Sequence, residues 1–117
     1  MSTRYLVFCF SALALFAQST DLAQALKPSR ERIDSIDGQI VKLLNERAQV
    51  VREVGLIKKR YNAPVNAPGR EDQVLRRAGE QARAPLTAPV VEAIYRTILR
   101  EMSAMEQAEV EKSKKAR

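Results

Sequence analysis

The chain has 117 residues, of which 45% are hydrophobic and 29% charged, and this length and composition suit one small globular domain. It contains 20 Lys and Arg against 14 Asp and Glu, a formal net charge of +6, with one Cys and no His. Without His, the common zinc sites and His-dependent triads lack their usual ligands and bases, so we expect no metal. The cationic excess predicts an anionic partner.

The N-terminus has the pattern of a signal peptide. Arg4 precedes the apolar stretch Tyr5–Phe16, and no further charge occurs until Asp21. The stretch is about a dozen residues long, which is short of the ~20 that a membrane-spanning helix needs. We therefore expect export to the periplasm or the medium, and no membrane anchor after cleavage.

Cleavage is expected after Ala25, because Ala23-Gln24-Ala25 is a small-x-small site. Residues 1–25 would then be removed and residues 26–117 would form the mature domain. A site near Ser19 and an uncleaved, flexible N-terminus are the alternatives. Cys9 lies inside the apolar stretch, so the mature chain would have no disulfide.

A long first helix is predicted from Ser29 to about Tyr61. Pro28 and Ser29 give a start signal, and Asn62-Ala63-Pro64 gives a stop. Such a helix is about 45 Å long, more than a domain this small covers by itself, so a helical partner, a second copy of the chain, is implied. Helical spacing relates its apolar residues, which are Ile33, Ile36, Ile40, Leu43, Leu44, Val50, Val51, Val54 and Ile57.

Two further helices follow, and no segment alternates like a strand, so the predicted fold class is all-α with three helices. The second helix runs from Arg70 to about Arg83. The third is capped by Thr87, has Pro89 in its first turn, and reaches about Val110. We expect the closing Lys112–Arg117 run to be a frayed, solvated tail.

Arg47 interrupts the apolar stripe of the first helix, because the three-four spacing through Leu43 and Val50 includes its position. A buried guanidinium without a partner is very costly. Arg47 therefore requires a bound anion, an internal carboxylate, or a side chain that reaches water.

Two other cations are placed relative to Arg47 by helix geometry. Lys58 lies eleven residues later, on the same face and about 16 Å along the axis, so the two side chains can close on a ligand between them. Arg30 lies about 25 Å before Arg47 and roughly 100° around the helix, so it reaches the same pocket only from an antiparallel partner. Spacing alone favours an exposed, first-turn Arg30 and leaves open a merely solvated Lys58.

The remaining candidates lie on the second and third helices. Glu106 follows Tyr95, Leu99 and Met102 at four- and three-residue steps, at the edge of the apolar face. It either faces the pocket or is a surface glutamate. Arg70-Glu71, at the start of the second helix, is either a pocket pair or ordinary first-turn charge.

Read together, the charged residues form an ordered pattern: Arg30-x-x-Ile33-Asp34-x-Ile36-Asp37-x-x-Ile40-Val41-x-Leu43-Leu44-x-x-Arg47, then Val54-Gly55-x-x-Lys58, then Pro64-Val65-x-x-Pro68-x-Arg70-Glu71. This pattern closely resembles the all-helical chorismate mutases over Ser29 to Gln107. The resemblance implies an intertwined homodimer with two equivalent sites, each taking Arg30 from the opposite protomer. It also implies the pericyclic rearrangement of chorismate to prephenate, which needs no cofactor.

The resemblance assigns roles to six residues. Arg30 of the partner, Arg47 and Arg70 would bind the substrate carboxylates and hold the reactive conformer. Lys58 would donate to the ether oxygen and Glu71 would accept from the ring hydroxyl. Glu106 falls where the family has Gln or Glu beside the ether oxygen, and a carboxyl donates there only when protonated.

The sequence departs from the family at two positions. Ala67 stands where many members have Asp, and Met102 stands where some have Ser, so two accessory hydrogen bonds are lost. An isochorismate-pyruvate lyase of the same fold is the nearest alternative, although Arg70-Glu71 favours the mutase. A non-catalytic exported module that binds an acidic partner is the alternative of another class. No aromatic residue lies among the cations as a stacking platform, so we expect no nucleic-acid binding.

Overall fold

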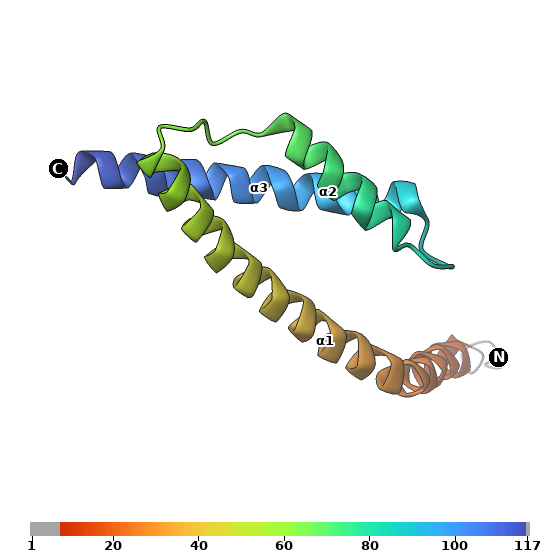
Figure 1. The fold of residues 1–117 in the computed structure, drawn as a ribbon. Helices are drawn as coiled ribbons and strands as arrows, with labels where there is room; N and C mark the ends of the chain where they lie inside the picture. The colour runs from red at the N-terminus through yellow and green to blue at the C-terminus, as the bar shows by residue number, and fades with distance from the viewer. Residues whose placement is uncertain (1–7, 117) are drawn as a thin grey trace, which may run out of the picture. The chain divides into compact units, whose positions relative to one another are not determined.

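The computed structural model describes residues 8–116, without the side chains of residues 8–18 and Pro68. Three helices make up these residues: α1 (Phe8–Arg60), α2 (Pro68–Glu80) and α3 (Ala88–Lys115) (Figure 1). The described residues contain no strand, which confirms the predicted all-α class with three helices. Arg4, on which the signal-peptide interpretation relies, lies outside the described residues. In the described part of the chain, no helix combines the length and apolarity needed to cross a membrane.

The chain divides into two units, residues 1–43 and 44–117, and α1 contributes to both. In the first unit, α1 begins well before the predicted start at Pro28 and Ser29, so that prediction was wrong. Residues 22–27 are all Leu, Ala, Gln or Lys, which favour helix. Pro28 removes one backbone hydrogen bond, to the carbonyl of Gln24, and the helix continues through it because both flanks are strong helix formers.

The apolar stripe of the first unit is not covered within that unit. Ile33, Ile36, Ile40 and Leu43 are between 49% and 62% exposed. In the second unit Val50, Val54 and Ile57 continue the same spacing and are also exposed. The stripe is therefore uncovered in a single chain, which leaves a long apolar helix face open to solvent.

The second unit consists of residues 44–60 of α1 together with α2 and α3, and α2 packs along α3 (Figure 1). Ala78 and Gly79 are buried where these two helices approach. A Cβ atom at Gly79 would come within 2.7 Å of Oε1 of Glu92, the far end of a flexible side chain on α3, which shows how closely α2 and α3 approach at this position.

The C-terminal end of α1 and the N-terminal end of α3 follow the sequence signals, whereas α2 runs from Pro68 to Glu80 instead of from Arg70 to about Arg83. Helix α1 stops at Arg60, and Asn62 takes a left-handed conformation with φ of 51°, which Asn tolerates better than most residues. Thr87 is the extended N-cap residue of α3, as predicted, although its side chain makes no capping hydrogen bond.

The C-terminal end of α3 also differs from the prediction, because α3 continues to Lys115 instead of ending near Val110. The predicted frayed tail was wrong for residues 112–115. Lys side chains in the last turn interact favourably with the helix dipole, and Lys112 pairs with Glu109 at 3.7 Å. Ser113 adds a tertiary contact, since its Oγ accepts a hydrogen bond of 2.6 Å from Lys59 Nζ.

The N-terminus of α2 lacks a side-chain cap, because Ala67 occupies the N-cap position. We predict that Ala67→Asp stabilises the fold by about 1 kcal/mol, since its carboxylate can accept from the free N–H groups of the first turn. Urea unfolding at a fixed chain concentration, followed by circular dichroism, measures the gain. Ala67→Asn should share most of it. An equal gain from Asn66→Asp, which adds the same charge outside the cap, would contradict the capping explanation.

Candidate functional site

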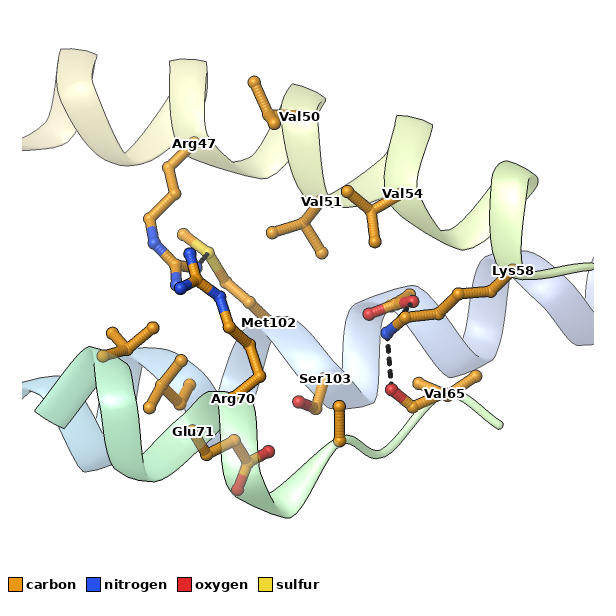
Figure 2. Close-up of a pocket in the computed structure, with 14 residues that line it drawn as sticks. Arg47, Val50, Val51, Val54, Lys58, Val65, Arg70, Glu71, Met102 and Ser103 are labelled. Carbon is orange, nitrogen blue, oxygen red and sulfur yellow. Dashed lines mark hydrogen bonds and ion pairs between the residues drawn. The ribbon is translucent and has the colours of Figure 1, made fainter. Parts of the chain in front are cut away.

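A cavity of about 300 Å³ lies in the second unit, between residues 47–58 of α1, the chain before α2, the first turns of α2 and the middle of α3 (Figure 2). Its apolar wall is mainly valine. The lining residues are Arg47, Val50, Val51, Val54, Lys58, Val65, Ala67, Arg70, Glu71, Val74, Leu99, Met102, Ser103 and Glu106. Five of the six residues to which the sequence assigns roles therefore come together at one cavity.

Helix periodicity explains why α1 supplies both a cation and an apolar wall. Arg47, Val51, Val54 and Lys58 follow one another at four-, three- and four-residue steps, so their side chains share one face of α1. Figure 2 shows these side chains directed toward α3 and the start of α2. The two valines separate the cations, so any ligand that contacts both cations also contacts apolar surface.

Arg47 has no carboxylate partner among the residues that the structure describes. Its Nη1 donates a hydrogen bond of 2.6 Å to Sδ of Met102, and a thioether is a weak acceptor. The side chain is part-buried, so water replaces the missing acceptors only in part. The sequence left three possibilities for Arg47: a bound anion, an internal carboxylate, or a side chain that reaches water. The described part of the chain contains no ion pair between Arg47 and a carboxylate. A guanidinium with unused donors is thus directed at the cavity.

Lys58 and Glu106 form an ion pair at the opposite end of the cavity. The distance between Lys58 Nζ and Glu106 Oε1 is 3.0 Å, and Nζ also donates to the carbonyl oxygen of Val65 at 2.6 Å. Oε1 has no hydrogen-bond partner among the described protein atoms, so its contact with Lys58 is ionic and lacks hydrogen-bond geometry.

Glu106 is the single charged residue of the described chain that is buried, at 5% exposure. The alternative that it is a surface glutamate is therefore wrong. A carboxylate removed from water at this depth requires a cation, and Lys58 supplies it. The pair fixes the ammonium group at the cavity wall, 22% exposed, where a ligand can reach it.

Arg70 and Glu71 reach the cavity from the first turn of α2. Arg70 is exposed and makes one long hydrogen bond of 3.4 Å to Gln73, while Glu71 is half-buried. In Figure 2 the side chains of Arg47 and Arg70 extend toward each other from opposite walls. An anion bound between these two walls would meet hydrogen-bond donors from both guanidinium groups.

Arg30 belongs to the first unit, where it is exposed, whereas the residues that line the cavity all belong to the second unit. Sequence reasoning also missed three features of the site. These are the thioether contact of Met102 with Arg47, the carbonyl contact of Val65 with Lys58, and the packing of Gly55 against Glu106. The Val54-Gly55-x-x-Lys58 motif was a signal for the last of these.

Three cations and a single buried carboxylate thus face a small cavity with valine walls. The arrangement can bind a compact anion that carries more than one negative charge and some apolar surface. Within the described residues no group of His, Cys, Asp and Glu has the arrangement of a metal site. The charged groups that line the cavity are the cations Arg47, Lys58 and Arg70 and the carboxylates Glu71 and Glu106.

Comparisons with known proteins point in the same direction. The T-protein of Haemophilus influenzae is 36% identical over 84 residues, which are 71% of this chain and 22% of that protein. The bifunctional chorismate mutase/prephenate dehydratase of Neisseria gonorrhoeae is 38% identical over 88 residues, 75% of this chain and 24% of that protein. The chain thus spans about a quarter of the length of these relatives.

Among solved structures, the chorismate mutase from Helicobacter pylori, crystallised in complex with prephenate, superimposes with a TM-score of 0.69 at 22% identity. The superposition covers 75% of this chain and 96% of that one, and it shows a shared fold. Residues 29–107, which include every lining residue of the cavity, match the chorismate mutase type II family. The chain therefore belongs to the chorismate mutase type II family.

Proposed function

We propose that this protein is a chorismate mutase, which converts chorismate to prephenate. The observation that carries the proposal is Arg47, a part-buried guanidinium directed at the cavity with a thioether as its hydrogen-bond partner. A second guanidinium, that of Arg70, approaches from the opposite wall. Chorismate is a dicarboxylate of small size, so it brings the two negative charges that these cations lack.

The rearrangement requires little chemistry from the protein. The ether carbon–oxygen bond breaks while a carbon–carbon bond forms within the same molecule, so no atom, proton or electron is exchanged with the enzyme. The protein has to hold the folded conformer and stabilise the negative charge that gathers on the ether oxygen. Arg47 and Arg70 serve the first task by binding carboxylates. Lys58 serves the second by donating to the ether oxygen from its fixed position at the wall.

The two carboxylates of the site have different roles in this scheme. Glu71, half-buried on α2, accepts a hydrogen bond from the ring hydroxyl of the substrate. Glu106 lies against Lys58, within the region where the ether oxygen would lie. Donation from Glu106 to that oxygen requires its protonated form.

Replacement of Lys58 by Ala is expected to lower kcat for chorismate by roughly 10²–10³-fold, the usual loss when one preorganised donor to an oxyanion is removed. Consumption of chorismate, followed by absorbance, measures the effect. Lys59→Ala is the matched control, because the adjacent lysine bonds to Ser113 outside the cavity, and it should retain the native rate.

Equal rates for the native protein and Lys58→Ala would contradict the mechanism. Product analysis separates the mutase from a lyase of the same fold, since the mutase yields prephenate without release of pyruvate. Pyruvate formed from isochorismate would instead assign the site to the lyase.

We also propose that the working enzyme is a homodimer in which each site takes Arg30 from the partner. Two observations support this: Arg30 is exposed, and the apolar stripe of α1 is uncovered. Along the helix Arg30 is also about 25 Å before Arg47. A second copy of α1 laid antiparallel on that stripe would bury it. It would also carry Arg30 toward the other chain's Arg47.

A mixing experiment tests the shared site. Arg30→Ala and Arg47→Ala chains are expected to be nearly inactive alone. Unfolded together and refolded as a mixture, about half of the dimers are mixed, and each mixed dimer has one complete site. About a quarter of the native activity should return. Arg47→Ala mixed with Lys58→Ala should remain inactive, because those two residues come from one chain. Equal behaviour of the two mixtures would contradict donation of Arg30 in trans.

Export is the third part of the proposal, and it rests on Arg4, the apolar stretch and the small-x-small site in the sequence. We propose that the protein is exported to the periplasm or the medium, where the mature chain begins at Leu26. N-terminal sequencing of the protein recovered outside the cytosol of a bacterial host checks this. An N-terminus near Thr20 would move the cleavage site, and an intact Met1 on protein confined to the cytosol would contradict export.

A further inference from the structure

Gly55 of α1 is buried against the side chain of Glu106 on α3. A Cβ atom added at Gly55 would lie 2.9 Å from Cγ of Glu106, 3.5 Å from its Oε1 and 3.6 Å from its Cδ. Two carbon atoms pack at about 3.5–4.0 Å. Glu106 therefore occupies the space that any side chain at position 55 would need.

The contact cannot be relieved by moving the end of a flexible side chain. Cγ is the second carbon of Glu106 and stays close to the α3 backbone, so moving it requires a different rotamer or a shift of the helix. Gly79 provides a contrast: the atom nearest its added Cβ is Oε1 of Glu92, the mobile end of a side chain that is paired with Arg96 at a loose 3.8 Å.

Gly55 is also one helical turn before Lys58, so the two residues face the same part of α3. Glu106 lies over Gly55, and from that position its Oε1 reaches Lys58 Nζ at 3.0 Å. Lys58 is held in turn by the Val65 carbonyl at 2.6 Å. Together these three contacts fix the position of the Lys58 ammonium group at the cavity.

We propose that Gly55 is a positioning residue for the reaction: its missing side chain lets Glu106 lie on α1, with its carboxylate against the ammonium group of Lys58. This inference rests on the proposed role of Lys58 and Glu106 at the ether oxygen. A larger residue at position 55 displaces the Glu106 carboxylate. Lys58 then loses the partner that orients it, whereas Arg47 and Arg70 keep their places.

Intrinsic preference alone predicts the opposite effect on the fold. Ala is a better helix former than Gly, so Gly55→Ala in an open helix would raise the melting temperature. A lower melting temperature for Gly55→Ala therefore reports the clash with Glu106. Gly79→Ala is the matched control, because it also adds a methyl group to a buried helical glycine but lies outside the cavity.

The test is a double-mutant cycle of native protein, Gly55→Ala, Glu106→Ala and the double variant, each measured for kcat and KM with chorismate. Gly55→Ala should lower kcat roughly ten-fold or more while KM changes by less than about two-fold. In the Glu106→Ala background, where Cγ is absent, the same substitution should change kcat by less than about two-fold. Gly79→Ala should keep the native kcat.

An equal loss from Gly55→Ala in both backgrounds, or no loss in either, would overturn the inference. If Gly55→Ala does not fold, adding Glu106→Ala must restore the fold, and failure to do so overturns it as well. Thermal unfolding of the four proteins measures the coupling between position 55 and Glu106 in the absence of substrate. A native protein that consumes no chorismate but shows the coupling in melting temperature would therefore reject the proposed reaction and retain the contact.

Discussion

The organisation of the site depends on an imbalance of charge in a small cavity. Glu106 pairs with Lys58, so one cation of the cavity has a buried partner, whereas Arg47 has the thioether of Met102. Arg70 points toward Arg47 from the opposite wall, and its hydrogen-bond partner among the described residues is the neutral amide of Gln73. A part-buried charge without a partner lowers the stability of the fold. An anionic ligand bound in the cavity would supply the missing partner. The valine wall sets the size of the ligand, and the cations set its charge.

The same imbalance fits a reaction in which nothing is exchanged with the protein. A pericyclic step is accelerated by holding one conformer and by stabilising charge that exists only in the transition state. Long cationic side chains on rigid helices suffice for both tasks. Val51 and Val54 displace water between the cations, which strengthens every donor that faces the cavity. A chain without His can therefore have an active site of this kind.

Helical periodicity made the position of Arg47 and Lys58 predictable, because residues on one face of a single helix are related by arithmetic. Periodicity placed Glu106 only at the edge of the apolar face of α3. How deeply its side chain is buried depends on how closely α1 and α3 approach each other. That approach depends on Gly55, at which the sequence shows only the absence of a side chain. The start of α1 was misplaced because Pro28 is a local signal, while the helix is decided by the residues on both sides of it.

A single chain buries little apolar surface. Ala78 is the one hydrophobic residue of the described chain that is buried, while Ile33, Ile36 and Ile40 are about half exposed. Ordering each residue costs about 1–2 kcal/mol of conformational entropy, which so little apolar burial does not offset. Under the proposed dimer, the face that stabilises the fold is also the face that brings Arg30 to the cavity. Folding, assembly and completion of the site would then be one event, and a single chain would have neither the core nor the full set of cations.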